Sequence, residues 1–291
     1  MGNHAISNSK ITVEIKELGA EITSMTTADG HEYLWQGHPD HWIGQSPLLF
    51  PIIGGLPEDS YLLDGKTWKM KSHGFARKSE WEMECRDSNS IIFNLKSTPG
   101  TLKIYPFNFK LSVIYSIHDN CLEVEYEVFN LDNKTMPFSI GGHPAFNCPL
   151  ETGADLSDYR IKFEKVENVE RLLKKDLLTG KTAPCLENSD RISLTHELFD
   201  DGALIFRDLE SSRLTMEKKD STGKKITLEF PGFTHFGIWK KPKTDAPFIC
   251  LEPWYGVDST EGDPGEIENK EGIINLEPSG IFKAGYRIIL D

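Results

Sequence analysis

Two side chains that can carry protons stand directly before prolines. His143 lies in GGHPAFN (141–147) and Glu252 lies in CLEPWYG (250–256). A proline pushes the residue before it towards an extended conformation and has no amide donor of its own. The glycines before His143 accept φ/ψ values closed to other residues and permit close approach of a ligand. An acid and a base, each expected at the end of a strand, indicate proton-transfer chemistry.

A third segment, SHGFAR (72–77), carries a second histidine and a cation. On an extended chain His73 and Arg77 share one face. Trp239 and Trp254 add two indole rings, which can pack on the apolar C–H faces of a sugar while charged groups bind its hydroxyls. This set of side chains is typical of a site for a polyhydroxylated, largely neutral ligand.

Each of these residues also has an ordinary structural interpretation. A lone histidine is usually a hydrogen-bonded polar residue, Arg77 suits a plain surface cation, and Trp239 and Trp254 suit a core equally well. Glu252 differs, because it follows the apolar run FICL (248–251) of an apparently buried strand. Burying a carboxylate without a purpose is costly, so a functional role is favoured there.

The elements that must position these residues are mostly strands. Residues 122–128 alternate apolar side chains with glutamates, as in a half-buried strand, and residues 118–120 predict the hairpin turn before it. Many short strands between Gly, Pro and Asp clusters predict an all-β sandwich or barrel in a single domain, residues 1–291. Short helices are expected only near Pro39–Trp42 and Leu194–Phe199. The other expected strands are Ile11–Ile15, Ile91–Leu95, Ser112–Ile117, Ile161–Phe163, Leu214–Lys218, Ile226–Phe230, Phe248–Leu251 and Ile281–Leu290.

The composition narrows the class of partner. A net charge of −13 argues against a nucleic-acid surface, and argues against a strongly anionic substrate unless a local cationic pocket overrules it. No apolar run approaches the length of a membrane span, so no membrane partner is expected. Five widely spaced cysteines without a CxxC motif favour a cytoplasmic location, and exposed-looking aromatics permit a monomer or a homodimer. These cysteines are Cys85, Cys121, Cys148, Cys185 and Cys250.

Two metal-binding alternatives are open. The acidic, Gly-rich run 258–271 is expected to form a surface loop, with a calcium loop as the alternative, although it lacks the EF-hand spacing. A metal site formed by His73, His143 and Glu252 is the second alternative.

At these residues the chain resembles the aldose 1-epimerase (mutarotase) family, and within it the LacX-type branch of galactose mutarotase-like proteins. The resemblance implies a β-supersandwich with few short helices, and interconversion of the α and β anomers of an aldose without a metal or organic cofactor. By the residue match, Glu252 is the base, His143 the acid, His73 a ligand of hydroxyls near C1, and Arg77 a further sugar contact. The matching segments are LFPIIG (49–54), HGFAR (73–77), GHPAFN (142–147), GIW (237–239) and EPWYG (252–256).

One position departs from the family pattern. Relatives commonly carry an arginine that reaches the substrate where this chain has Gly55. The contact is then either missing or supplied by another cation, such as Lys71 or Lys78. The substrate is expected to be a small sugar, a hexose or a hexose phosphate.

Three functions are therefore open besides a mutarotase of free hexoses. One is an epimerase of hexose 6-phosphates, and another is a non-catalytic carbohydrate-binding or sensing protein on the same fold. A glycosidase is the third, and it would need a second carboxylate, for which Asp201 and Asp258 are the candidates.

Overall fold

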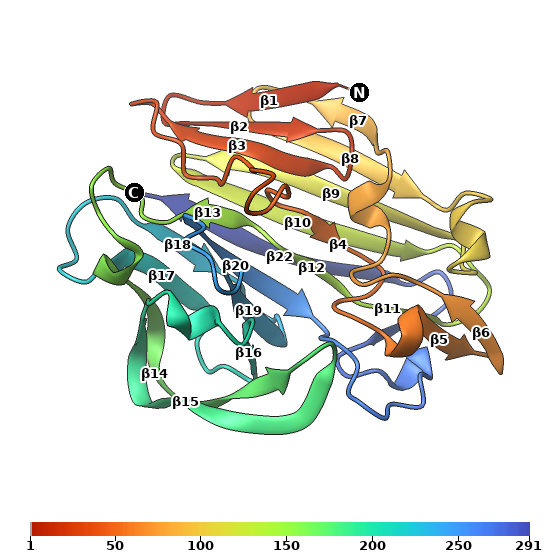
Figure 1. The fold of residues 1–291 in the computed structure, drawn as a ribbon. Helices are drawn as coiled ribbons and strands as arrows, with labels where there is room; N and C mark the ends of the chain where they lie inside the picture. The colour runs from red at the N-terminus through yellow and green to blue at the C-terminus, as the bar shows by residue number, and fades with distance from the viewer. Residues whose placement is uncertain (1) are drawn as a thin grey trace.

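The computed structural model describes residues 2–291, and antiparallel β-strands dominate it (Figure 1). Fifteen strands belong to one large sheet, whose main path runs β4-β12-β20-β19-β16-β14-β17-β18-β22-β10-β9-β8-β7. β13 pairs with β20, and β15 pairs with β14. The strands of this sheet are β4 (Leu48–Leu49), β7 (Glu82–Arg86), β8 (Ser90–Lys96), β9 (Phe109–His118), β10 (Cys121–Asn130), β12 (Ile140–Gly142), β13 (Ala145–Asn147), β14 (Tyr159–Lys174), β15 (Leu178–Ser193), β16 (Leu204–Arg207), β17 (Arg213–Lys218), β18 (Ile226–Glu229), β19 (His235–Trp239), β20 (Phe248–Tyr255) and β22 (Ile281–Leu290).

Three smaller sheets surround the large one, and Figure 1 shows the first of them along the top of the molecule. They are β1 (Asn3–Ser7) with β2 (Ile11–Lys16) and β3 (Glu21–Thr27), β5 (Ser60–Leu63) with β6 (Lys66–Lys69), and β11 (Met136–Phe138) with β21 (Ile274–Leu276). The helices within residues 2–291 are single 3₁₀ turns: η1 (Pro57–Asp59), η2 (Ala76–Lys78), η3 (Thr101–Lys103), η4 (Leu156–Asp158), η5 (Glu197–Phe199) and η6 (Ile267–Asn269). None of the helices in this part of the chain has the length and apolar character that crossing a membrane requires.

The alternating pattern of residues 122–128 explains how the sheet meets its core. On β10 the apolar side chains Leu122, Val124 and Tyr126 are buried, while Glu125 between them is exposed. β22 pairs with β10 on one side and β18 on the other, and it buries Ile288 and Leu290 in the same core. The expected all-β fold with few short helices is therefore confirmed.

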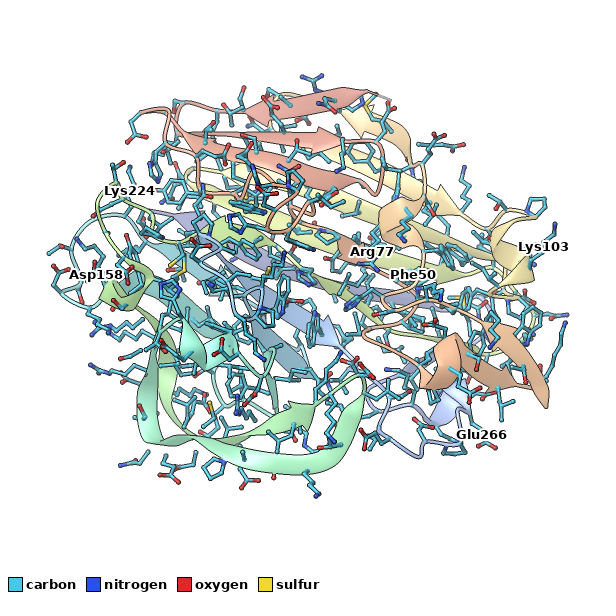
Figure 2. The ribbon with its side chains drawn as sticks, in the orientation of Figure 1. Phe50, Arg77, Lys103, Asp158, Lys224 and Glu266 are labelled. Atoms are coloured by element: carbon cyan, nitrogen blue, oxygen red, sulfur yellow. The ribbon has the colours of Figure 1, made fainter. Side chains whose placement is uncertain are left out.

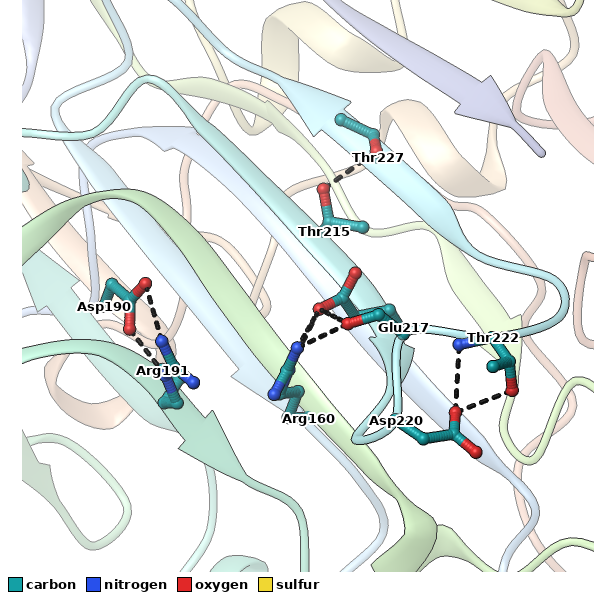
Figure 3. A network of polar contacts seen from close by, with 9 residues as sticks. Arg160, Asp190, Arg191, Thr215, Glu217, Asp220, Thr222 and Thr227 are labelled. Carbon is teal, nitrogen blue, oxygen red and sulfur yellow. Dashed lines mark hydrogen bonds and ion pairs between the residues drawn. The ribbon is translucent and has the colours of Figure 1, made fainter.

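Polar pairs also join the neighbouring strands β14, β17 and β18 (Figure 3). Arg160 on β14 donates from Nε and Nη2 to one carboxylate oxygen of Glu217 on β17, at 2.9 and 2.6 Å. The hydroxyls of Thr215 and Thr227 share a hydrogen bond of 2.9 Å across β17 and β18. These contacts fix the register of the strands from which the long β14–β15 hairpin extends.

One expected helix is absent and one is shorter than expected. Pro39–Trp42 forms a tight turn instead, which His38 and Trp42 close with a backbone hydrogen bond of 3.0 Å. The Trp42 carbonyl also accepts the indole N–H of Trp35, so this backbone has partners without a helix. In the second segment only Glu197–Phe199 is helical.

Candidate active site

Glu252 lies inside strand β20 rather than at its end, which corrects the expectation from Pro253. The strand continues to Tyr255 because Pro253, which has no N–H to offer, is still paired in the ladder with β19. Alternate side chains of β20 point to opposite faces. Ile249 and Leu251 enter the main core, whereas Glu252 faces a separate cavity and is only 1% exposed.

His143 lies in the short connection between β12 and β13, where the backbone is held from both sides. Its N–H donates to the carbonyl of Pro47 at 3.1 Å, and the Leu251 N–H donates to the carbonyl of Pro144 at 3.1 Å. The second of these bonds joins the histidine segment directly to β20. The imidazole thereby faces the carboxyl of Glu252.

The two glycines before His143 are needed for packing against the protein's own side chains. A Cβ on Gly141 would lie 2.7 Å from Trp254, and one on Gly142 would lie 2.6 Å from the Tyr286 hydroxyl. Neither glycine has a positive φ. The expectation of backbone conformations closed to other residues is therefore wrong, and core groups approach these glycines closely instead; close approach of a ligand stays a prediction.

His143 and Glu252 form a buried pair, with Nε2 and Oε2 separated by 3.1 Å. The contact lacks hydrogen-bond alignment, so Oε2 of Glu252 has no hydrogen-bond partner among residues 2–291. The other ring nitrogen of His143, Nδ1, has none within this range either. Burial raises the pKa of Glu252 well above its usual range and lowers the pKa of His143 well below its own. Burial thus favours the uncharged forms of both groups, in which the pair holds one proton on Glu252, and moving that proton to His143 gives a carboxylate beside an imidazolium.

His73 and Arg77 reach the same cavity from a turn, and not from the extended segment that the sequence suggested. His73 has a positive φ of 63°, Gly74 follows with 67°, and Arg77 belongs to η2. Gly74 permits this path because a Cβ there would lie 2.2 Å from the Phe50 carbonyl oxygen. Figure 2 shows Arg77 beside Phe50, whose carbonyl accepts the N–H groups of residues 75 and 76.

Hydrogen bonds fix the tautomer of His73 and the orientation of Arg77. Nδ1 of His73 accepts the Gly54 N–H at 3.2 Å, so its Nε2 carries the proton and can donate to a ligand. Enclosure by protein and nearby cations, Arg77 first among them, lower the pKa of His73 to about 3, which keeps the ring neutral. Arg77 is oriented by a hydrogen bond of 2.9 Å from Nη2 to the Ser72 carbonyl.

Indole rings enclose the imidazole of His143. Trp239 meets it edge-on with ring centroids 5.8 Å apart, and Trp42 stacks on it at 5.0 Å. Trp254 also lines the cavity but is mostly core, packed among Leu49, Ile53 and their neighbours. Trp42 escaped the sequence analysis because it lies in an irregular turn, where no spacing pattern connects it to the histidine.

The cavity has a volume of about 290 Å³ and brings together all six residues that the sequence singled out. Their roles remain predictions. The other wall residues were not predicted as sugar contacts: Trp42, Lys174, Lys175, Asp201, Gly202, Ala203, Ile205 and Asp258.

The cations of this cavity are not the ones expected to replace the arginine at position 55. Lys71 and Lys78 are exposed and line a different cavity, in which Lys71 pairs with Asp59. Lys174 and Lys175, from the tip of the β14–β15 hairpin, line the candidate site instead. No local motif signals them, because a hairpin tip is brought to the site only by the tertiary fold.

The acidic run 258–271 is not simply a surface loop. Asp258, Ser259, Ile267 and Lys270 are buried, and Asp258 faces the cavity. Within residues 2–291 the three-donor cluster that could hold a metal ion is elsewhere, at His143, Cys250 and Glu252. Cys250 and Glu252 are neighbours on one face of β20, so strand geometry accounts for their closeness.

Both candidate second carboxylates, Asp201 and Asp258, lie in the cavity wall with Glu252. Asp258 is already engaged, because it pairs with Lys174 and accepts the Gly55 N–H at 2.7 Å. It is therefore poorly placed to act as a free acid or base beside a glycosidic bond.

Comparison with known proteins shows which family and which solved structures the chain is similar to. The family model for aldose 1-epimerase matches residues 3–275. Protein LacX (chromosomal) of Lactococcus lactis subsp. lactis is 35% identical over 296 aligned positions, which cover 98% of both chains. A galactose mutarotase related enzyme from Lactobacillus acidophilus superposes with a TM-score of 0.94 at 33% identity, covering 100% of this chain and 97% of that one. A galactose mutarotase-like protein from Lactobacillus casei ATCC 334 gives a TM-score of 0.94 at 32% identity over 100% of both chains.

These similarities extend over nearly the whole chain and confirm the expected galactose mutarotase-like β-supersandwich. The range matched by the family model includes the motifs around His73, His143 and Glu252. The chain belongs to the aldose 1-epimerase family.

Proposed function

We propose that this protein is an aldose 1-epimerase that interconverts the α and β anomers of a hexose. The observation that carries the proposal is the buried His143–Glu252 pair, 3.1 Å apart in a cavity walled by indole rings. Opening a hexose ring removes a proton from the C1 hydroxyl and adds one to the ring oxygen. An acid and a base that together hold one proton can accept the proton of the C1 hydroxyl and donate a proton to the ring oxygen in the same step.

The proton count closes over a full cycle. Glu252 as carboxylate takes the proton from the C1 hydroxyl, while protonated His143 gives its proton to the ring oxygen and the C1–O5 bond breaks. The aldehyde then rotates about C1–C2. When the ring closes on the other face, neutral His143 takes the hydroxyl proton at O5 and protonated Glu252 returns one to O1. The pair carries one proton throughout, and no other reactant is consumed.

The remaining cavity residues suit binding of the sugar. His73 offers an Nε2–H and Arg77 a guanidinium to hydroxyls near C1, and Trp239 offers a ring to an apolar C–H face. Trp254 contributes a smaller part of the wall, since most of its indole is buried in core. These assignments support a substrate that is largely neutral at the reacting end.

Polarimetry of freshly dissolved hexoses tests the function. The wild-type protein should accelerate mutarotation over buffer, and His143→Asn or Glu252→Gln should each lower kcat by roughly 10²–10⁴-fold. The matched controls His118→Asn and Glu125→Gln change the same residue types at exposed positions and should keep full activity. A wild type that accelerates no hexose or hexose phosphate would sink the proposal.

A second candidate substrate class is the hexose 6-phosphates, favoured by Lys174 and Lys175 in the cavity wall. Exchange NMR on glucose, galactose and their 6-phosphates, compared by kcat/KM, decides between the two classes. Measurable sugar affinity without any rate enhancement would instead favour a non-catalytic carbohydrate-binding protein.

A further inference from the structure

Lys174 is the last residue of β14, and its ammonium group is held in the cavity wall. Nζ pairs with Oδ1 of Asp258, a carboxylate that is only 2% exposed. The same oxygen accepts the Gly55 N–H at 2.7 Å, and a Cβ on Gly54 would lie 2.2 Å from the Asp258 carboxyl carbon. The backbone at 54–55 therefore fixes the carboxylate, and the carboxylate fixes the ammonium.

Backbone hydrogen bonds dock the hairpin tip that carries this lysine. The Leu178 N–H donates to the Ser259 carbonyl at 3.0 Å, and the Glu261 N–H donates to the Leu178 carbonyl at 2.7 Å. The Ser259 N–H in turn donates to the Gly55 carbonyl at 3.0 Å. Lys174 is thus anchored by the ion pair with Asp258 and by the docking of Leu178, which follows it in the chain.

The charges around Glu252 come from several elements. Burial raises the pKa of Glu252, the Lys174 ammonium lowers it, and the Asp258 carboxylate raises it. In an enclosed cavity such charges act through a lower effective dielectric than in water. The other titratable or charged groups of the cavity wall and its immediate surroundings are His73, Arg77, His143, Lys175, Asp201, Cys250 and Lys270.

We propose that Lys174, oriented by Asp258, is a positioning residue that sets how many protons the His143–Glu252 pair holds. The inference rests on the proposed function, because it assigns the pair its role in proton transfer. Without the ammonium, the buried carboxyl would hold its proton more tightly, so a smaller fraction of the protein would present Glu252 as the carboxylate that takes the C1 hydroxyl proton. Lys174 acts in this way through Glu252, and not by contact with the reacting atoms.

The pH dependence of kcat/KM tests the proposal. Removing a cation raises the proton affinity of the pair in both of its titration steps, so Lys174→Met should move both limbs of the profile to higher pH by about one unit. Asp258→Asn keeps an acceptor for the Gly55 N–H but removes the negative charge, so it should move both limbs to lower pH. Lys174→Arg should keep the wild-type profile.

Two further variants separate charge from folding. The double variant Lys174→Met/Asp258→Asn leaves no unpaired buried charge and should return both limbs close to their wild-type positions. Lys162→Met makes the same change at an exposed position of the same strand and should leave the profile unchanged.

A titration without substrate keeps this inference separate from the proposed function. Carboxyl ¹³C NMR of glutamate-labelled protein, with Glu252→Gln to assign the resonance, reports the proton affinity of Glu252 even in an inactive protein. Lys174→Met should raise the midpoint of that titration. An unchanged midpoint, or a rise in KM with both limbs in place, overturns the proposal. A wild type without activity but with the expected midpoints would defeat only the proposed function.

Discussion

At the scale of single residues, Glu252 combines the role of base that we propose for it with a cost in stability. Its pKa is raised in the folded protein by burial, whereas the unfolded chain releases the proton near the ordinary value of about 4.3. Above that pH the unfolded state therefore binds fewer protons than the native state. The contribution of this group to the free energy of unfolding falls as the pH rises.

Glu252→Gln should consequently be more stable than the wild type at alkaline pH, because the amide has no proton to lose. The gain should shrink towards pH 4, where both states of the wild type are protonated. Thermal unfolding from pH 4 to pH 9 measures it, with each ~1 kcal/mol appearing as roughly 2–4 °C. Glu125→Gln, on an exposed face, is the control, and equal melting curves for Glu252→Gln and wild type at every pH would contradict the argument.

Residue-level prediction from the sequence succeeded where local context is unusual. His143 and Glu252 precede prolines, and His73 lies in a short motif, so each was found from its neighbours. Trp42, Lys174 and Lys175 have unremarkable neighbours and reach the cavity only through tertiary contacts. No pattern within a few residues could have selected them.

At the scale of elements, the packing of β12 against β22 places His143. A Cβ on Gly142 would lie 2.6 Å from the hydroxyl of Tyr286, a side chain that is buried and packed in the core. Gly142→Ala should therefore cost about 1–3 kcal/mol in stability and lower activity further by shifting the adjacent histidine. Urea unfolding and polarimetry measure the two effects.

Two comparison variants sharpen that test. Gly142→Ala/Tyr286→Phe removes the hydroxyl and should recover part of the lost stability. Gly100→Ala, whose new Cβ would meet nothing nearer than Thr98 Oγ1 at 3.5 Å, should change stability by less than about 0.5 kcal/mol. A Gly142→Ala protein as stable as Gly100→Ala would show that the neighbourhood yields more easily than the geometry indicates.

The strands that the sequence predicted are those whose apolar residues alternate over a core. β10 and β22 were found nearly to their ends for this reason, whereas for β9 (Phe109–His118) only Ser112–Ile117 was predicted. β14 and β15 are the counter-example: each has 16 residues, most of them not buried, so only Ile161–Phe163 showed a pattern. The turn at His73 was missed because a positive φ at a histidine depends on the Gly54 and Phe50 backbone beside it.

At the scale of the whole molecule, the order of the strands in the large sheet differs from their order in the sequence. β22 is the last strand in sequence, yet it lies between β18 and β10 in the middle of the large sheet. A chain ending at Leu276 retains the full range matched by the family model but loses β22. It should fail to fold, because two neighbouring strands lose their ladder and the core loses Tyr286, Ile288 and Leu290.

Near-ultraviolet circular dichroism and gel filtration would report that failure. A chain that begins at Ser9 is the control, since it lacks only β1, which lies at the edge of its small sheet. It should fold with reduced stability. Native-like spectra from the chain ending at Leu276 would contradict the importance assigned to β22.

The tip of the β14–β15 hairpin is joined to the body of the protein mainly by backbone hydrogen bonds, through Leu178, Ser259 and Gly55. Such bonds are insensitive to side-chain identity, so residues 175–177, which follow the Lys174 that pairs with Asp258, can vary without disturbing the sheet beneath them. This stretch is a segment that protein engineering can replace while the rest of the protein keeps its fold. A library randomised there should yield many folded members that differ in which sugars they accept, while the proton-transfer pair on β20 and at His143 stays the same.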